Sequence, residues 1–322
     1  MKYRQLGRSG LQVSEIGLGT NNFGIHPGPT NYGSQMTPQA ARDVIDAALD
    51  FGVNLIDTAD VYSGGDSERY IGRALRGKRH KAVIATKFGG WWLSDKAGVG
   101  GSRQHIVTAV DRSLSRLRTD YIDLYQIHGP DPKTPIDETL RALDDLVRQG
   151  KVRYIGSSNF RGWQIVEAHW AARMHSTEMF ISSQSEYSLI ERDLEKDVIP
   201  VCSRYGLGIL PFFPLAHGLL TGRYSRGESA PLDSRLGKNR KAGERRLTES
   251  NFDLIDRITD WVEERGHTLL QLAFAWLLAH EDVSSVIAGA SRPDQIHQNA
   301  ASVDWQLTSE EMSELRLILE SA

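Results

Sequence analysis

The sequence predicts an α/β fold, a closed (β/α)8 barrel formed as a single domain over residues 1–322, with an N-terminal β-hairpin under the barrel floor and extra helices. The first observation is a repeated pattern, because eight short apolar runs each follow a helical stretch. Such runs are typical of parallel strands covered by helices. The second is size, since 322 residues without a break in composition suit a barrel that needs roughly 250.

The third observation excludes the main alternative, an open doubly wound sheet. That fold normally carries G-x-G-x-x-G after its first strand. Gly17 and Gly19 fit this fingerprint, but Asn22 stands at its third glycine position. The spacing therefore favours the closed barrel.

The elements follow one another in a regular order. Residues 2–14 carry a Gly-Arg-Ser-Gly turn between short alternating runs and predict the hairpin. Thr37 and Pro38 begin a helix over 37–52 that has one apolar face. The predicted strands lie within 15–21, 53–59, 82–88, 121–128, 152–159, 179–187, 207–215 and 283–290. The other predicted helices end near Gly77, start at Ser102, follow Pro135, or occupy 160–176, 191–206, 249–265 and 268–280.

Two connections are longer than usual. Residues 23–36 are rich in Gly and Pro, and residues 216–247 are basic and Gly-rich. Long loops in compact domains are usually functional or mobile. We expect the basic connection to act in phosphate binding, because it follows a strand at the barrel's functional face.

Composition limits the classes of function. A net charge of −3 argues against a broad nucleic-acid surface. No apolar run reaches the length of a membrane span, and the N-terminus lacks a signal-peptide core. Cys202 is the one cysteine, so no internal disulfide can form. We predict a cytoplasmic protein without a nucleic-acid or membrane partner; a homo-oligomer remains possible because the sequence does not determine it.

Polar residues end several predicted strands, where barrel active sites lie. Asp57, Lys87 and His128 end three of them, and Tyr62 follows the first closely. Singly, they could be a cap, a surface lysine, a core histidine and a packed ring. Together they form a proton-donating set, in which the ammonium stabilises phenolate, the carboxylate holds the ammonium, and the imidazole orients a carbonyl. No His-x-His pair or carboxylate cluster predicts a metal site.

Several segments identify a family resemblance. They are YRQLGRSGLQVSEIGLGT, LIDTADVYSGGDSE, VIATK, DYIDLYQIH, GKVRYIGSSNF, SQSEYS, PLAHGLLTGRY and IAGASRPDQIHQN. In this order they resemble the aldo-keto reductases, and most closely a bacterial group similar to potassium-channel beta subunits. The resemblance implies Tyr62 as general acid, with Asp57, Lys87 and His128 completing the set. His128 stands where channel subunits commonly have Asn, which favours a working reductase.

The resemblance also implies a nicotinamide cofactor, with NADP(H) preferred and NAD(H) possible. Arg235 and Arg292 would pair with its 2′-phosphate. Phe212 replaces the more usual Tyr or Trp beside the nicotinamide, and His217 replaces a small residue. The implied cofactor contacts are Gly19, Thr20, Asn21, Asp57, Ser158, Asn159, Gln184, Phe212, Phe213, Pro214, Leu215, Ala216, His217, Gly218, Arg223, Arg235, Gly289, Ser291, Arg292, Gln295, Gln298 and Asn299.

The substrate is expected to be a small aldehyde or ketone with aromatic or hydrophobic character. The expected pocket residues are Asn21, Phe23, Tyr32, Trp91 and Trp92. Two alternatives stay open. One is a nicotinamide-binding regulatory subunit with little turnover. The other is a barrel enzyme that forms a Schiff base on Lys87, which would require a desolvated and unpaired lysine.

Overall fold

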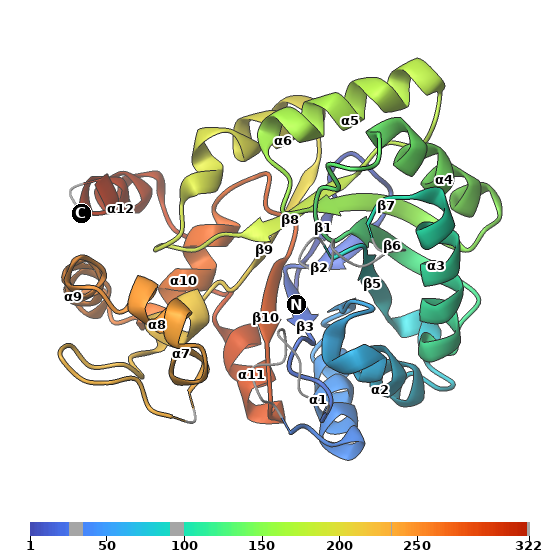
Figure 1. Cartoon of the computed structure of the whole chain (residues 1–322). Helices are drawn as coiled ribbons and strands as arrows, with labels where there is room; N and C mark the ends of the chain where they lie inside the picture. The colour runs from blue at the N-terminus through green and yellow to red at the C-terminus, as the bar shows by residue number, and fades with distance from the viewer. Residues whose placement is uncertain (26–34, 91–99, 233, 321–322) are drawn as a thin grey trace.

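The computed structural model describes residues 1–25, 35–90, 100–232 and 234–320. Its centre is a closed barrel of eight parallel strands in the order β10-β3-β4-β5-β6-β7-β8-β9 (Figure 1). The strands are β3 (Ile16–Gly19), β4 (Leu55–Asp57), β5 (Val83–Phe88), β6 (Ile122–Ile127), β7 (Val152–Ser158), β8 (Ser182–Glu186), β9 (Gly208–Phe212) and β10 (Val286–Gly289). The predicted (β/α)8 barrel is therefore confirmed.

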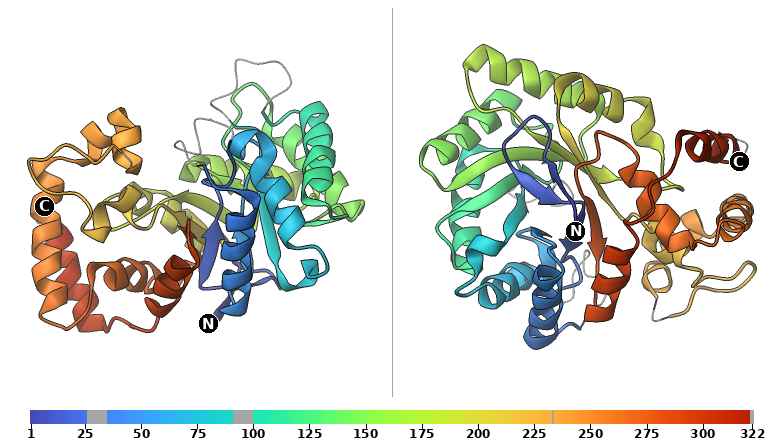
Figure 2. Two further views of the ribbon diagram at one scale, coloured as in Figure 1. Left: turned by 90° about the horizontal axis from the view of Figure 1, so that it is seen from below. Right: turned by 180° about the vertical axis from the view of Figure 1, so that it is seen from behind.

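Helices cover the outside of the barrel, and several more lie to one side of it (Figures 1 and 2). They are α1 (Pro38–Asp50), α2 (Asp66–Ala74), α3 (Arg103–Leu117), α4 (Ile136–Arg148), α5 (Gly162–His175), α6 (Val198–Tyr205), α7 (Arg235–Lys238), α8 (Arg240–Arg246), α9 (Glu249–Glu263), α10 (Leu269–Leu278), α11 (Pro293–Ala301) and α12 (Ser309–Glu320). In α1 the Thr37 side chain caps the first turn as predicted, accepting a hydrogen bond from the backbone of Ala40.

The predicted hairpin forms from β1 (Tyr3–Gln5) and β2 (Gln12–Ser14), which pair antiparallel. Leu6 and Val13 are fully buried against the lower barrel interior. Gly7 has a φ of 55°, and a Cβ there would lie 2.5 Å from the carbonyl oxygen of Ile181. Only glycine fits this approach. The hairpin thus closes the barrel floor, as the view from behind shows (Figure 2).

Two predicted segments differ in detail. The helix expected over 191–206 is a 3-10 turn (Asp193–Lys196) followed by α6. Pro200 lies in the first turn of α6, where a missing N–H is tolerated, whereas a position deeper in a longer helix would break it. The connection 216–247 contains a 3-10 turn, η5 (Ala216–Thr221), as well as α7 and α8.

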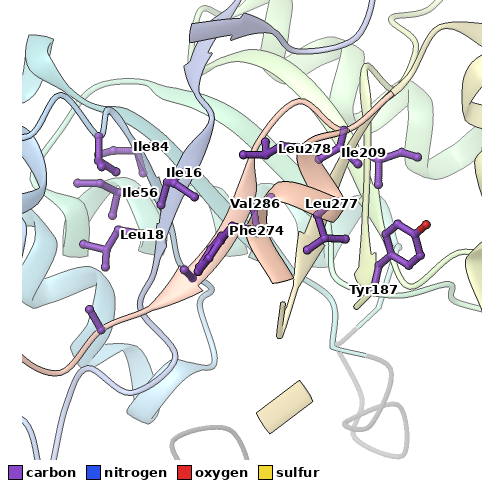
Figure 3. Close-up of a cluster of buried hydrophobic side chains, with 14 of the residues drawn as sticks. Ile16, Leu18, Ile56, Ile84, Tyr187, Ile209, Phe274, Leu277, Leu278 and Val286 are labelled. Carbon is purple, nitrogen blue, oxygen red and sulfur yellow. The ribbon is translucent and has the colours of Figure 1, made fainter. Parts of the chain in front are cut away.

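The main hydrophobic core lies between the strands and the surrounding helices. Ile56, Ile84 and Val286 contribute from the strands, and Phe274 contributes from α10 (Figure 3). Inside the barrel, by contrast, polarity changes along each strand. Leu55, Ala85 and Leu124 line the apolar lower interior. Because side chains alternate along a strand, the residues two positions further on face the same interior nearer its mouth.

Candidate active site

The residues two positions beyond that apolar layer include a buried ion pair. The Lys87 ammonium donates to Asp57 Oδ2 at 2.7 Å and to Oδ1 at 2.9 Å. It also donates to the carbonyl oxygen of Thr58 at 2.8 Å. Burial lowers the pKa of Lys87, but the carboxylate of Asp57 and then the Tyr62 hydroxyl outweigh it, so the net pKa is raised. The lysine therefore remains charged although its side chain is inaccessible.

Tyr62 begins the 3-10 turn η1 (Tyr62–Gly65) after β4. Lys87 Nζ lies 3.4 Å from the Tyr62 hydroxyl, close enough for a long hydrogen bond. The Tyr62 ring also lies edge-on to the His128 ring, with 5.8 Å between centroids. The structure therefore brings together the three residues expected at strand ends and Tyr62, which was expected just after the first of them.

A chain of hydroxyl groups holds the loop that carries Tyr62. Thr58 Oγ1 lies 2.9 Å from Ser67 Oγ, and Ser67 Oγ donates to Thr20 Oγ1 at 2.8 Å. Thr20 Oγ1 in turn donates to the carbonyl oxygen of Asp57 at 2.8 Å. These bonds tie β3, β4 and α2 together. No sequence pattern predicted this network, because isolated hydroxyl residues are common in any chain.

His128 is held in the same mouth in its neutral form. Burial, and then the Lys87 charge, lowers the pKa of His128 well below its usual value. Asn159 Nδ2 donates to the His128 carbonyl oxygen at 2.9 Å and so fixes the end of β6. A neutral imidazole beside the Tyr62 hydroxyl can donate a hydrogen bond to a carbonyl oxygen without adding charge.

The site opens into one cavity of about 1340 Å³. Asp57, Tyr62 and His128 border it, whereas Lys87 is absent from the described residues that line it. The other described lining residues that were expected to contact cofactor or substrate are Gly19, Thr20, Asn21, Ser158, Asn159, Gln184, Phe212, Phe213, Pro214, Leu215, His217, Gly218, Arg223, Arg235, Gly289, Ser291, Arg292, Gln295, Gln298 and Asn299.

The inner end of the cavity carries amide and hydroxyl groups. Gln184 Nε2 donates to Asp57 Oδ1 at 2.8 Å, which leaves the amide oxygen of Gln184 as an acceptor. Asn159 has a left-handed backbone, with a φ of 59°, and donates to Ser158 Oγ at 3.0 Å. Phe213 also has a positive φ, of 54°. Sparsely populated backbone conformations concentrate at functional sites.

The middle and outer parts of the cavity are basic. Among the described lining residues on that side, Arg223, Arg235 and Arg292 are cationic and Glu263 is the one carboxylate. Arg235 Nη2 donates to Asn21 Oδ1 at 3.2 Å, which links α7 to the loop after β3. The balance of charge favours an anionic ligand.

Arg292 and Gln295 lie at the start of α11. Gln295 Oε1 accepts hydrogen bonds from the backbone N–H groups of Ser291 and Arg292, at 2.7 and 3.2 Å. Arg292 is exposed and pairs with Asp294 at 3.0 Å. An anion that bound Arg292 would therefore compete with Asp294.

Some expected positions need correction. Phe23, expected at the substrate pocket, is absent from the described cavity lining, because its side chain is fully buried in the hydrophobic core. Ala216 is also buried and is absent from the described lining. Tyr32, Trp91 and Trp92 lie outside the described residues.

One wall of the cavity was not anticipated from the sequence. It is formed by α9, α10 and the turn between them, whereas the connection after β9, which also lines the cavity, was expected to do so. The additional lining residues are Asn22, Leu220, Thr221, Gly222, Tyr224, Asn239, Ile255, Thr259, Val262, Glu263, His267, Thr268, Leu269, Leu270, Ile287, Ala288 and Ala290. Ordinary amphipathic helices give no sign of which face will border a cavity.

Asp60 lies behind this site, and the sequence left it without a role. Its Oδ1 is buried and has no hydrogen-bond partner among the described residues. Burial, and then the Glu68 carboxylate, raises the pKa of Asp60 from 3.8 to about 7. Glu68 itself is fixed by Arg116 at 2.5 Å and by Thr86 Oγ1 at 2.7 Å. Asp60 therefore carries a proton in the folded state over a range in which the unfolded chain has lost it.

We expect Asp60→Asn to stabilise the protein at high pH. The folded pKa lies above the unfolded value, so the contribution of Asp60 to folding becomes less favourable as the pH rises from about 4 to about 7, then levels off. The difference in unfolding free energy between variant and wild type should grow by up to a few kcal/mol over this range, since one pKa unit is worth about 1.4 kcal/mol. Urea unfolding at pH 5 and pH 8 measures it. Asp260→Asn, at an exposed position of α9, is the control and should show no such trend.

The described residues hold neither a cluster of metal-ligating side chains nor a helix that could span a membrane. No group of three or more His, Cys, Asp or Glu side chains there could hold a metal ion. No helix in that part of the chain is long and apolar enough to cross a membrane.

Known proteins resemble the chain along nearly its whole length. Residues 15–320 match the Aldo/keto reductase family. A probable voltage-gated potassium channel subunit beta from Oryza sativa subsp. japonica is 36% identical over 331 residues, covering 100% of this chain and 97% of its own length. A protein of the same description from Arabidopsis thaliana is 37% identical over 312 residues, covering 94% and 92%. Versiconal hemiacetal acetate reductase from Aspergillus parasiticus is 35% identical over 343 residues, covering 98% and 96%.

Proposed function

Because the chain belongs to the aldo/keto reductase family, as the sequence motifs predicted, we propose that it is an NADPH-dependent oxidoreductase that reduces aldehydes or ketones to alcohols. Family membership and a reductase relative support an oxidoreductase. The observation that carries the finer proposal is the arrangement of a charged lysine, a phenol and a neutral imidazole at the inner end of a long basic cavity.

The residues present fit a nicotinamide dinucleotide. Ser158, Asn159 and Gln184 offer donors and acceptors at the inner end, as a carboxamide requires. Arg223 and Arg235 offer positive charge further out, as phosphates require. When bound, such a cofactor would supply the hydride.

The side chains of the site would supply the proton. His128, being neutral, would orient the substrate carbonyl oxygen beside the Tyr62 hydroxyl. Tyr62 would donate its proton to that oxygen as negative charge develops on it. The Lys87 ammonium, 3.4 Å away, would stabilise the resulting phenolate, and Asp57 would keep that ammonium in place.

The two alternative functions differ in their support. A regulatory subunit with little turnover is favoured by the two channel-subunit relatives. A broad panel of carbonyl substrates followed by NADPH absorbance separates it from a reductase, because a regulatory subunit would bind the cofactor without consuming it. A Schiff base on Lys87 is disfavoured, because both oxygens of Asp57 hold the amine away from the described cavity lining.

The preference for NADPH is tested at Arg292. We expect Arg292→Ala to weaken NADPH binding about 10- to 100-fold, because the variant loses a charge-assisted hydrogen bond to the 2′-phosphate. Binding of NADH, which lacks the 2′-phosphate, should weaken by less than about twofold. Fluorescence titration with both cofactors measures the two dissociation constants.

Asp294→Asn provides the matched test, because it removes the carboxylate that competes for Arg292. This variant should bind NADPH more tightly than wild type does and should bind NADH with unchanged affinity. Equal losses for both cofactors in Arg292→Ala would show that Arg292 does not bind the 2′-phosphate.

A further inference from the structure

His217 is an unusual residue in the cavity wall. It follows β9 within η5, and its backbone is left-handed, with a φ of 60°. The side chain is buried, and its ring packs on Phe213 with 4.0 Å between centroids. The Tyr224 hydroxyl donates to the His217 carbonyl oxygen at 3.2 Å, which helps hold this backbone. The mechanism proposed above gives His217 no task.

The groups facing His217 carry both signs of charge. From β8, Glu186 Oε1 lies 3.3 Å from His217 Nε2. From α8, Arg246 contacts the same Glu186 oxygen at 2.5 Å and lies 3.9 Å from Glu191. From α7, Arg235 reaches over the neighbouring Phe213 ring, 4.9 Å from its centroid. The imidazole thus lies between a carboxylate with its arginine on one side and the basic cavity on the other.

This environment determines the protonation state of the imidazole. Burial lowers the pKa of His217, the Glu186 hydrogen bond opposes that effect, and the Arg246 charge adds to it, with a net lowering. The ring is therefore mostly neutral at pH 7 in the free protein. Glu186 stays ionised, because His217 and Arg246 together outweigh the effect of burial and lower its pKa.

We propose that His217 takes up a proton from solvent when the diphosphate of a nicotinamide dinucleotide enters the cavity, so that cofactor binding is proton-linked. The inference rests on the proposed cofactor. A diphosphate near the ring would place negative charge on the cavity side as well as at Glu186, and an imidazolium between two anions is favoured. The added proton occupies the second ring nitrogen, and no other bond changes.

The direction of the linkage follows from the two states. The pKa of His217 is higher in the complex than in the free protein, so the complex binds more protons between those two values. Cofactor affinity is therefore greatest at low pH and declines as the pH rises through the pKa of the complex. A coupling of ordinary size predicts at least about a 5-fold change in Kd.

Calorimetric titration with NADH tests the proposal. NADH is used because the 2′-phosphate of NADPH titrates in the same pH range. At pH 6.5, repeated in two buffers of different ionisation enthalpy, wild type should show net uptake of a fraction of a proton per NADH bound. Between pH 6 and pH 8 its Kd should rise by about 5-fold or more.

Two variants assign the proton to His217. His217→Gln keeps a neutral hydrogen-bonding side chain with a similar reach to Glu186, and His217→Asn suits the left-handed backbone. Both should bind NADH without proton uptake and with a Kd independent of pH. His267→Gln is the matched control, because His267 borders the same cavity but stacks on Trp305 at 4.0 Å instead. It should keep the wild-type uptake.

The possible results are distinct. Uptake in wild type and His267→Gln, but not in the two His217 variants, supports the proposal. The proposal is overturned if the enthalpy of NADH binding to wild type does not depend on the buffer, or if the folded His217 variants keep the full proton uptake. Either result leaves the cofactor assignment intact. No binding of NADH or NADPH by wild type overturns the proposed function itself, and this inference with it.

Discussion

Tyr62→Phe should lower kcat for carbonyl reduction by about 10²- to 10⁴-fold, the usual worth of a general acid. The change removes one oxygen and keeps the ring that lies edge-on to His128. The ion pair between Lys87 and Asp57 should also persist, because Lys87 Nζ lies 3.4 Å from the Tyr62 hydroxyl but 2.7 Å from Asp57 Oδ2. The loss should therefore be chemical and not structural.

Steady-state rates and NADPH titration separate these two effects. We expect the Kd for NADPH to stay within about threefold of wild type, since no uniform binding contact is removed. Tyr121→Phe is the control, because that ring lies between Arg79 and Arg153 before β6, at the opposite end of the barrel, and should keep full activity. Full activity in Tyr62→Phe would exclude Tyr62 as proton donor.

The barrel and the four inner residues were predictable for one reason. Periodic apolar runs give strands, and in a parallel barrel all strand ends meet at one rim. Asp57, Lys87 and His128 could therefore be placed near one another from chain order alone. Tyr62 joined them through its nearness to Asp57 and the chemistry of the set, since a loop residue five positions beyond a strand end has no fixed direction, and the family resemblance implied the same role.

Features set by tertiary contacts were not predictable in the same way. Phe23 was expected at the substrate pocket and is buried, because loop residues can face the core as easily as the cavity. The α9–α10 wall depends on how two helices far along the chain pack beside the barrel. The protonation state of His217 depends on Glu186 and Arg246, which lie in separate elements. No local pattern in the sequence reports such distances.

Lys87→Met should destabilise the protein by roughly 3–5 kcal/mol and also abolish most activity. The stability loss arises because Asp57 would remain buried with its charge uncompensated, keeping Gln184 as its side-chain donor. The activity loss arises because no cation would remain to stabilise the Tyr62 phenolate. Urea unfolding and steady-state rates measure the two losses separately.

A double variant distinguishes the causes of these losses. Lys87→Met combined with Asp57→Asn leaves no unpaired charge, so it should recover much of the stability lost in Lys87→Met alone. It should not recover activity, because the ammonium near the phenol is still absent. Recovery of activity together with stability would mean that Lys87 serves only to hold the fold. A stability loss below about 1 kcal/mol in Lys87→Met would instead mean that water reaches Asp57 and that the pair is not isolated in the barrel.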